Sequence, residues 1–306
     1  MDWDAEVDVL CVGAGIGGLA TAIAAVDAAA DVMVTGALRA DDGRWVRGDE
    51  VRSGTLGTVL EARIDEFGVP RGIADDGPAP EPESGEAVEP GEAGPAVPET
   101  DEQLDATAVY FAAVTAEVDT DLSAEPSHGL VVPTRAVRKL TESETHTRSI
   151  ETFFGAGLLD WARVCLGSAT GALYSTVRGW SSETVRDSSD KTLRVASLGA
   201  IEWHAGDGLG ELFDWLAAAA AERDIAISSD STLQSLLFED RRIIGAELNT
   251  PDGPYFVRAR HGVVISPDFT DAGAPAEDDA PPAGGLEVCI VGSPASRFAR
   301  VELVAR

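Results

Sequence analysis

VDVLCVGAGIGGLATAIAAVDAAADVMVT, residues 7–35, is the stretch that decides the fold. It begins with an apolar run of strand type and continues with a GxGxxG turn over residues 13–18. A helix of small side chains over residues 19–29 and a β-branched run over residues 31–35 follow. A lone GxGxxG turn is a weak signal, but this order of elements predicts the start of a dinucleotide-binding βαβ unit rather than an unrelated glycine turn.

Three glycines of the turn have distinct physical roles. Gly13 permits the sharp turn from strand to helix, Gly15 lets the backbone approach a pyrophosphate, and Gly18 lets the helix pack tightly on the strand. The first-turn amides and the positive end of the helix would then face the phosphates. Thr35 stands where an acidic residue usually binds the ribose hydroxyls, and it can make only a single uncharged hydrogen bond there. Arg39 is the alternative, as a partner for the 2′-phosphate of NADP.

The composition of the 306-residue chain disfavours several function classes. Its net charge of −30 argues against a nucleic-acid groove and against an anionic membrane surface. The longest uncharged apolar stretch, residues 9–26, fits the glycine turn and helix better than a membrane span. The three cysteines form no CxxC pair, so neither a metal site nor a disulfide framework is predicted. An acidic N-terminus and buried thiols predict a cytoplasmic protein, and the lysine-poor, alanine-rich composition indicates a GC-rich, actinobacterial source.

An acidic segment follows the βαβ start. Residues 72–134 contain 15 Asp or Glu and no Lys or Arg. Residues 74–103 have no apolar periodicity, so they cannot bury enough surface to offset the entropy of ordering. They predict a disordered acidic loop, and the alternative is an acidic tail for a basic partner.

The rest of the chain contains further periodic segments. Helices are predicted over residues 104–118, 149–165 and 211–223. Strands are predicted over residues 225–228, 233–238, 243–248, 255–259, 262–265, 287–291 and 300–304.

One group of these segments resembles a known family. It consists of GDGL at 206–209, the helix LFDWLAAAA at 212–220, IAI at 225–227, LQSLLF at 233–238, RRIIGA at 241–246 and VRA at 257–259. Together with residues 7–35, about a third of the chain resembles the flavoprotein subunits of fumarate reductase and succinate dehydrogenase and the 3-ketosteroid dehydrogenases. The resemblance implies an α/β fold. It consists of a Rossmann-like, GR2-type FAD-binding domain with a β-meander, built from residues 1–73 and 201–306, and a reduced α+β substrate or cap region over residues 104–200.

The resemblance also implies a cofactor and a set of site residues. FAD would meet Gly13, Gly15 and Gly18 through its pyrophosphate, with Thr35 at the ribose, Leu233 at the adenine and Ser266 beside the flavin. Flavin dehydrogenation needs a group that moves a proton while the flavin takes the hydride. Tyr174 and His204 are the candidate catalytic residues, and the alternatives are a packed tyrosine and a solvated histidine. Arg178 and Arg186 would bind a carboxylate or form surface salt bridges.

Departures from the family pattern leave two hypotheses. ISPDF at 265–269 replaces a Gly-Gly turn, residues 41–48 do not align with the glycine-rich stretch that cradles the flavin, and a second FAD segment is not visible near the C-terminus. The first hypothesis is an FAD-dependent oxidoreductase that transfers hydride to or from a small hydrophobic or keto substrate of ketone, steroid or enoyl type. The second is a non-catalytic flavoprotein-like subunit that partners a second protein chain.

Overall fold

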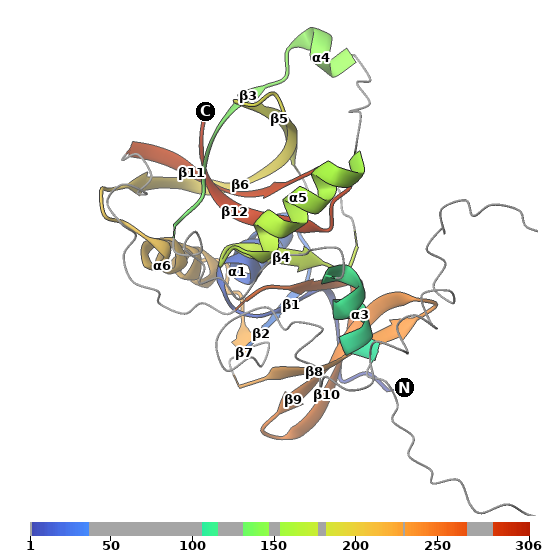
Figure 1. The fold of residues 1–306 in the computed structure, drawn as a ribbon. Helices are drawn as coiled ribbons and strands as arrows, with labels where there is room; N and C mark the ends of the chain where they lie inside the picture. Colours follow the sequence, from blue (N-terminus) through green and yellow to red (C-terminus); the bar gives the residue numbers. More distant parts are fainter. Residues whose placement is uncertain are drawn as a thin grey trace, which may run out of the picture.

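The computed structural model describes residues 2–36, 106–115, 131–146, 154–176, 182–228, 230–267 and 284–306. These residues form mostly strands with few helices: twelve strands in one hydrogen-bonded sheet, and five helices (Figure 1). A Rossmann-type α/β class is therefore not confirmed for the chain as a whole, because the described part is largely sheet. The predicted acidic loop over residues 74–103 lies outside the described residues, as do Arg39, Arg178 and residues 41–48.

The elements have the following bounds. The strands are β1 (Ala5–Val12), β2 (Val32–Thr35), β3 (Thr134–Lys139), β4 (Gly171–Tyr174), β5 (Glu183–Asp187), β6 (Thr192–Trp203), β7 (Ile227–Ser228), β8 (Thr232–Glu239), β9 (Arg242–Thr250), β10 (Gly253–Ile265), β11 (Gly284–Gly292) and β12 (Phe298–Ala305). The helices are α1 (Ile16–Asp27), α3 (Ala106–Thr115), α4 (Glu142–His146), α5 (Phe154–Leu166) and α6 (Leu209–Ala221).

The predicted βαβ unit is present. β1 and β2 are parallel, with Val12 opposite Thr35, and α1 connects them. β10 lies on the other side of β1 and is also parallel to it, with Val12 opposite Ile265. β7 continues the parallel set beyond β2. The carboxyl ends of β1, β2 and β10 therefore meet at one edge of the sheet, where the glycine turn leaves β1.

β8, β9 and β10 form an antiparallel meander, as the resemblance implied. The two strands predicted over residues 255–259 and 262–265 are one strand, β10. The polar pair Arg260 and His261 interrupts the apolar pattern because it lies where the register with β1 shifts: Val7 is opposite Ala259, and Val9 is opposite Gly262.

Five strands close on themselves in the upper part of Figure 1. β11 pairs with β6, β6 with β5, β5 with β3, β3 with β12, and β12 again with β11. We call this set the five-stranded ring. The sequence did not predict β3, β4, β5 or β6, and the expected domain boundary at residue 200 falls inside β6. The division into domains stays a prediction.

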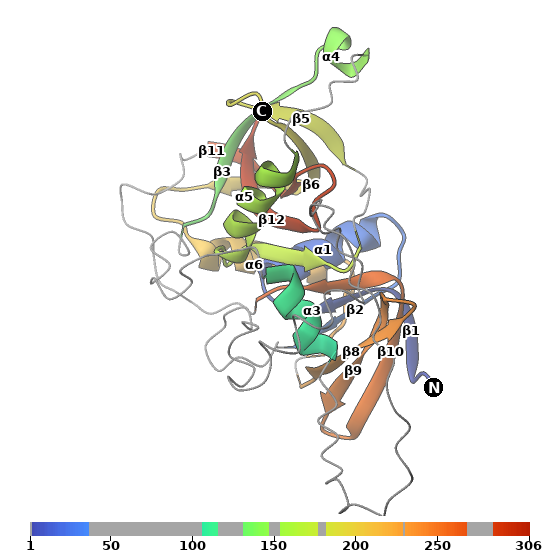
Figure 2. The same cartoon turned by 45° about the vertical axis from the view of Figure 1, so that its right-hand side comes forward.

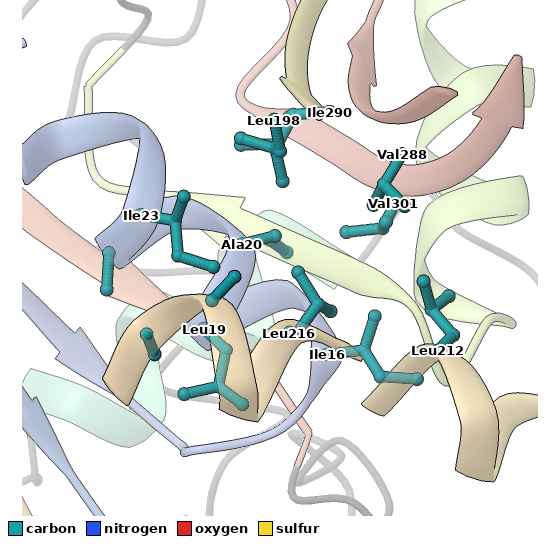
Figure 3. Packing of buried hydrophobic residues seen from close by; sticks show 14 of the residues in the cluster. Ile16, Leu19, Ala20, Ile23, Leu198, Leu212, Leu216, Val288, Ile290 and Val301 are labelled. Atoms are coloured by element: carbon teal, nitrogen blue, oxygen red, sulfur yellow. The ribbon is translucent and has the colours of Figure 1, made fainter. Parts of the chain in front are cut away.

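Two helices fill the space between the parallel strands and the ring. α1 contributes Ile16, Leu19 and Ile23, and α6 contributes Leu212 and Leu216 (Figure 3). They pack against outward-facing side chains of the ring, which include Leu198, Val288, Ile290 and Val301.

α3 and α5 lie on the opposite face of β1 and β10, in front of the sheet in Figure 2. The parallel strands are thus buried on both faces, which explains their continuous apolar runs. Among the helices that the structure describes, none has the length and hydrophobicity that a bilayer crossing requires.

Candidate dinucleotide-binding turn and neighbouring pocket

The glycine turn is held together by backbone contacts that leave no room for side chains. Gly13 has φ +94°, in the left-handed region, and a Cβ there would collide with the carbonyl oxygen of Ser266. A Cβ on Gly18 would collide with the carbonyl oxygen of Gly13, which brings the helix directly onto the turn. The turn itself therefore requires both glycines, whatever it binds.

The N-terminus of α1 has backbone donors without a side-chain cap. Gly15 is the N-cap residue, with φ −77° and ψ −171°, and the first turn contains no acidic residue. The hydrogen bonds of the described residues provide no acceptor for the amides of residues 16–18. Within residues 13–18, Ala14 is partly exposed and the others are buried. Such a helix end attracts an anionic group through its amides and its dipole.

Ser266 and Thr35 flank the turn, and both support backbone. The fully buried Ser266 donates its backbone N–H to the Val12 carbonyl at 2.9 Å and its hydroxyl to the Gly13 carbonyl at 3.1 Å. Thr35 is also fully buried, and its hydroxyl lies 3.3 Å from the Gly36 carbonyl oxygen and 3.5 Å from that of Cys11. The structure thus brings Gly13, Gly18 and Ser266 into contact, with Thr35 at the end of the neighbouring strand.

Leu233 lies in a different part of the sheet. It pairs with Leu248 in the meander, and β9 separates its strand from β10. Its side chain is partly buried against the core on the α3 and α5 side of the sheet. Its role at an adenine stays a prediction.

Tyr174 is buried in β4 and is tied to α1. Its hydroxyl lies 2.9 Å from the Thr21 hydroxyl, which in turn donates to the Gly17 carbonyl at 2.8 Å. Because Thr21 has only one hydroxyl hydrogen, Tyr174 is the donor between the two. Burial raises the pKa of Tyr174 well above its usual range, although the Thr21 contact opposes this shift. Here the phenol is a protonated link between β4 and α1.

Two adjoining pockets share Tyr174 and Thr176 in their walls. The larger one, which we call the ring-side pocket, lies between β4 and the outer face of the five-stranded ring. Its polar wall includes Ser182, Arg194 and Ser293. Arg194 was not predicted as a site residue. It lies outside the GxGxxG turn and outside the segments that resemble the flavoprotein family, in a strand that the sequence did not predict.

His204 occupies different surroundings. It lies in the turn between β6 and α6, and its side chain is 73% exposed. Asp207 accepts the backbone N–H of His204 at 2.7 Å and lies 3.3 Å from its Nδ1. Neither of the two pockets includes His204, so the structure does not bring it together with Tyr174. A catalytic role for either residue stays a prediction.

A cluster of charged residues inside the five-stranded ring was not foreseen. Arg135 donates to the fully buried carboxylate of Glu302 at 2.6 and 2.9 Å and to Asp187 at 2.9 Å. Arg300 donates to the same Glu302 at 2.7 Å. The hydrogen bond to Glu302 is the main cause that raises the pKa of Arg135. The indole of Trp161, 5.9 Å from the Arg135 guanidinium and 5.7 Å from that of Arg300, covers the cluster.

Arg186 and the three cysteines lie in structural surroundings. Arg186 pairs with Glu144 at 3.2 Å, in agreement with the salt-bridge alternative. The three cysteines are free and buried, and burial raises the pKa of Cys11 and of Cys289 to about 12. The part of the chain that the structure describes contains no group of three or more His, Cys, Asp or Glu residues suited to a metal ion.

Comparisons with known proteins found solved structures of low similarity and no match among protein families or curated proteins. No protein-family model and no curated protein matches it. A geranylgeranyl bacteriochlorophyll reductase-like protein from Thermoplasma acidophilum is 15% identical over 83% of this chain and 38% of that one, with a TM-score of 0.26. A flavocytochrome c3 fumarate reductase is 16% identical over 84% and 33%, with a TM-score of 0.28. The 3-ketosteroid-Δ4-(5α)-dehydrogenase from Rhodococcus jostii RHA1 is 16% identical over 87% and 46%, with a TM-score of 0.31.

The chain thus spans less than half the length of each of these structures. Because every TM-score is well below 0.5, these likenesses carry no argument about function. The functional proposal rests on the residues of the chain itself.

Proposed function

We propose that the chain binds FAD through the pyrophosphate at residues 13–18 and is an FAD-binding oxidoreductase. In this proposal β1, α1, β2, β7 and β10 form the Rossmann-like part of a GR2-type domain, joined by the meander. Residues 1–73 and 201–306 belong to that domain, and residues 104–200 to a reduced second region. The observation that carries the proposal is the uncapped start of α1, at the sheet edge where β1, β2 and β10 all end.

The residues present fit the pyrophosphate of FAD better than its ribose. Gly15 places no side chain over the first-turn amides, and no carboxylate in that turn competes for them. Thr35, at the end of β2, is fully buried with its hydroxyl directed at backbone oxygens. It therefore supplies no charged acceptor for the ribose hydroxyls. In the proposal Ser266 holds the turn from behind, and Leu233 provides backbone contacts to the adenine.

A bound flavin supplies hydride acceptance or donation, and the proposed substrates are ketones, steroids or enoyl-type compounds. Tyr174 and His204 are the proposed groups for proton movement. Both have surroundings that favour a second candidate function, a non-catalytic flavoprotein-like subunit that partners another chain. The Tyr174 hydroxyl already donates to Thr21, and His204 lies exposed outside both pockets.

The test places a negative charge at the proposed phosphate position and gives α1 the side-chain cap that it lacks. Gly15→Asp puts a favourable N-cap side chain at the start of α1, where it occupies the first-turn amides and repels phosphate. Gly208→Asp is the matched control, because Gly208 is the extended N-cap glycine of α6, far along the chain from the turn. The measurements are the visible absorption spectrum, the FAD released on denaturation, and the free energy of unfolding.

We expect the wild type and Gly208→Asp to bind FAD after it is added, and Gly15→Asp to be colourless while it unfolds at a similar denaturant concentration. A wild-type protein that stays colourless in excess FAD contradicts the FAD proposal and supports the non-catalytic subunit. Equal FAD content in Gly15→Asp and the wild type would show that the pyrophosphate does not bind at this turn.

A further inference from the structure

The ring-side pocket differs in charge from the rest of the chain. The chain contains 53 Asp and Glu residues against 23 Lys and Arg. Eleven of the described residues line the pocket, and they include Arg194 and no carboxylate. Arg194 makes no ion pair within the part of the chain that the structure describes, although arginines on neighbouring ring strands, such as Arg135 and Arg186, are paired. An anion in this pocket would therefore be attracted by the Arg194 guanidinium, and no carboxylate in the described wall would compete with it.

Backbone pairing leaves one side of Arg194 without a neighbouring side chain. Arg194 on β6 lies opposite Gly292 on β11, so the neighbouring position on the same face of the sheet carries no side chain. Arg194 is exposed, and its neighbour Ala196 in the pocket wall is small and buried. The planar fork of an arginine matches the two oxygens of a carboxylate or a phosphate.

Serine hydroxyls in the same wall have hydrogens to donate. The Oγ of Ser182 is buried and has no hydrogen-bond partner among the described residues. Ser296 accepts the backbone N–H of Phe298 at 3.0 Å, which leaves its own hydroxyl hydrogen available. A buried hydroxyl without a partner is destabilising, and a bound acceptor would satisfy it.

The size of the pocket limits what it can hold. Its volume is about 30 Å³, which exceeds the minimum of about 10–15 Å³ that a cavity needs to hold one water. That room suits a compact oxyanion group. The phenyl and aliphatic part of the wall, which includes Phe298, Ile290 and Ala299, would face the carbon side of such a group.

We propose that the ring-side pocket binds a compact oxyanion, a carboxylate or a phosphate, with Arg194 as its charged anchor and Ser182 and Ser296 as hydroxyl donors. None of the eleven lining residues belongs to the glycine turn at residues 13–18, and Arg194, Ser182 and Ser296 are not among the residues proposed to hold FAD. In this proposal the oxyanion therefore binds whether or not FAD is present. Its failure and the failure of the FAD proposal are therefore distinguishable, because each has its own ligand and its own variants.

The experiment titrates the full chain with sodium acetate and with sodium phosphate, with sodium chloride at equal ionic strength as the reference. The backbone amide chemical shifts of Gly292 and Ser293 report binding, and circular dichroism checks the fold of each variant. Arg194→Gln removes the anchor. Arg242→Gln is the matched control, because Arg242 is an exposed arginine at the start of β9 and makes the same change in net charge.

We expect saturable shifts with acetate or phosphate but not with chloride. Arg194→Gln should raise the dissociation constant by about tenfold or more, the loss expected for a charge-assisted hydrogen bond, while Arg242→Gln should leave it within about twofold. Saturation with acetate alone identifies a carboxylate ligand, and saturation with phosphate alone identifies a phosphate. Ser182→Ala should weaken binding severalfold without lowering the midpoint of unfolding, because its hydroxyl has no partner to lose.

The proposal is overturned if neither anion gives saturable shifts in the wild-type protein. It is also overturned if Arg242→Gln weakens binding as much as Arg194→Gln, since that result shows only a general charge effect. Unchanged affinity in Ser182→Ala contradicts the assignment of the hydroxyl donors.

Discussion

The glycine turn and the five-stranded ring are stabilised by opposite means. In the turn, backbone atoms of Gly13, Gly18 and Ser266 approach so closely that no Cβ fits between them, and the hydroxyl of Ser266 is neutral. In the ring, charged side chains meet in the interior, with Arg135 between the carboxylates of Glu302 and Asp187. The turn therefore depends on the absence of side chains. The ring depends on the pairing of the charged side chains that it buries.

The largest expected effect is the loss of one partner from the ring cluster. Arg135→Met keeps the length of the side chain but leaves the fully buried Glu302 with Arg300 alone and removes an arginine contact from Asp187. Breaking a buried ion pair from one side typically destabilises a protein by about 3–5 kcal/mol. We expect a loss of that size in the free energy of unfolding, measured by urea titration.

The same substitution at an exposed pair is the control. Arg258 lies 3.6 Å from Glu6, and the two side chains are 47% and 43% exposed. Arg258→Met should cost less than about 1 kcal/mol, because solvent screens an exposed pair. If the two variants lose the same amount, the ring cluster is no more important than a surface salt bridge.

The second largest expected effect comes from adding a Cβ to the glycine turn. Gly13→Ala forces a left-handed φ of +94° on a residue with a Cβ and directs that Cβ at the Ser266 carbonyl oxygen. Strain of this kind costs about 1–3 kcal/mol. Gly157→Ala in α5 is the control, since a Cβ there meets no atom of the described residues within 4 Å, and it should stabilise by about 0.5–1 kcal/mol. Denaturant unfolding of both variants measures the difference, and a neutral Gly13→Ala contradicts the strained geometry.

The same contrast explains what the sequence predicted. The βαβ unit and the meander are made by neighbouring segments, so a local period and a GxGxxG spacing are enough to predict them. The roles of Gly13 and Gly18 in shaping the turn follow from the same spacing. Ser266 was placed beside the flavin by resemblance, and its contact with the Gly13 carbonyl depends on a residue 253 positions away.

The ring could not be predicted in this way, because its strands pair across long separations. Arg135 and Glu302 are 167 positions apart, and each alone reads as an ordinary surface charge. On β12, Arg300 and Glu302 are two residues apart and share one face, which is a signal for a charged interior only once the ring is known. Arg194 and Gly292 were missed for the same reason: only the pairing of β6 with β11 places them side by side.

The smallest expected effect tests why one charge matters more than another of equal exposure. Asp8 on β1 and Arg135 in the ring each have a side chain that is 19% exposed. The partners of Asp8, Arg260 and His261, are 48% and 50% exposed, whereas those of Arg135 are 0% and 5% exposed. Burial of the partners, not of the residue itself, then decides the size of the effect.

The pH dependence follows from the Asp8 carboxylate. The backbone N–H of Asp31, at 2.9 Å, is the main cause that lowers the pKa of Asp8 from its usual 3.8, and Arg260 and His261 add to it. A carboxylate with a lowered pKa contributes stability that is fully present above its unfolded pKa and is lost as the pH falls through its folded pKa. The free energy of unfolding of the wild type should therefore fall below about pH 4, and Asp8→Asn should make that fall shallower by less than about 1 kcal/mol. Urea unfolding of both proteins between pH 7 and pH 3 measures the difference. A steeper acid loss in Asp8→Asn than in the wild type contradicts the stabilising role of the Asp8 carboxylate, and a difference as large as that of Arg135→Met contradicts the rule drawn from partner burial.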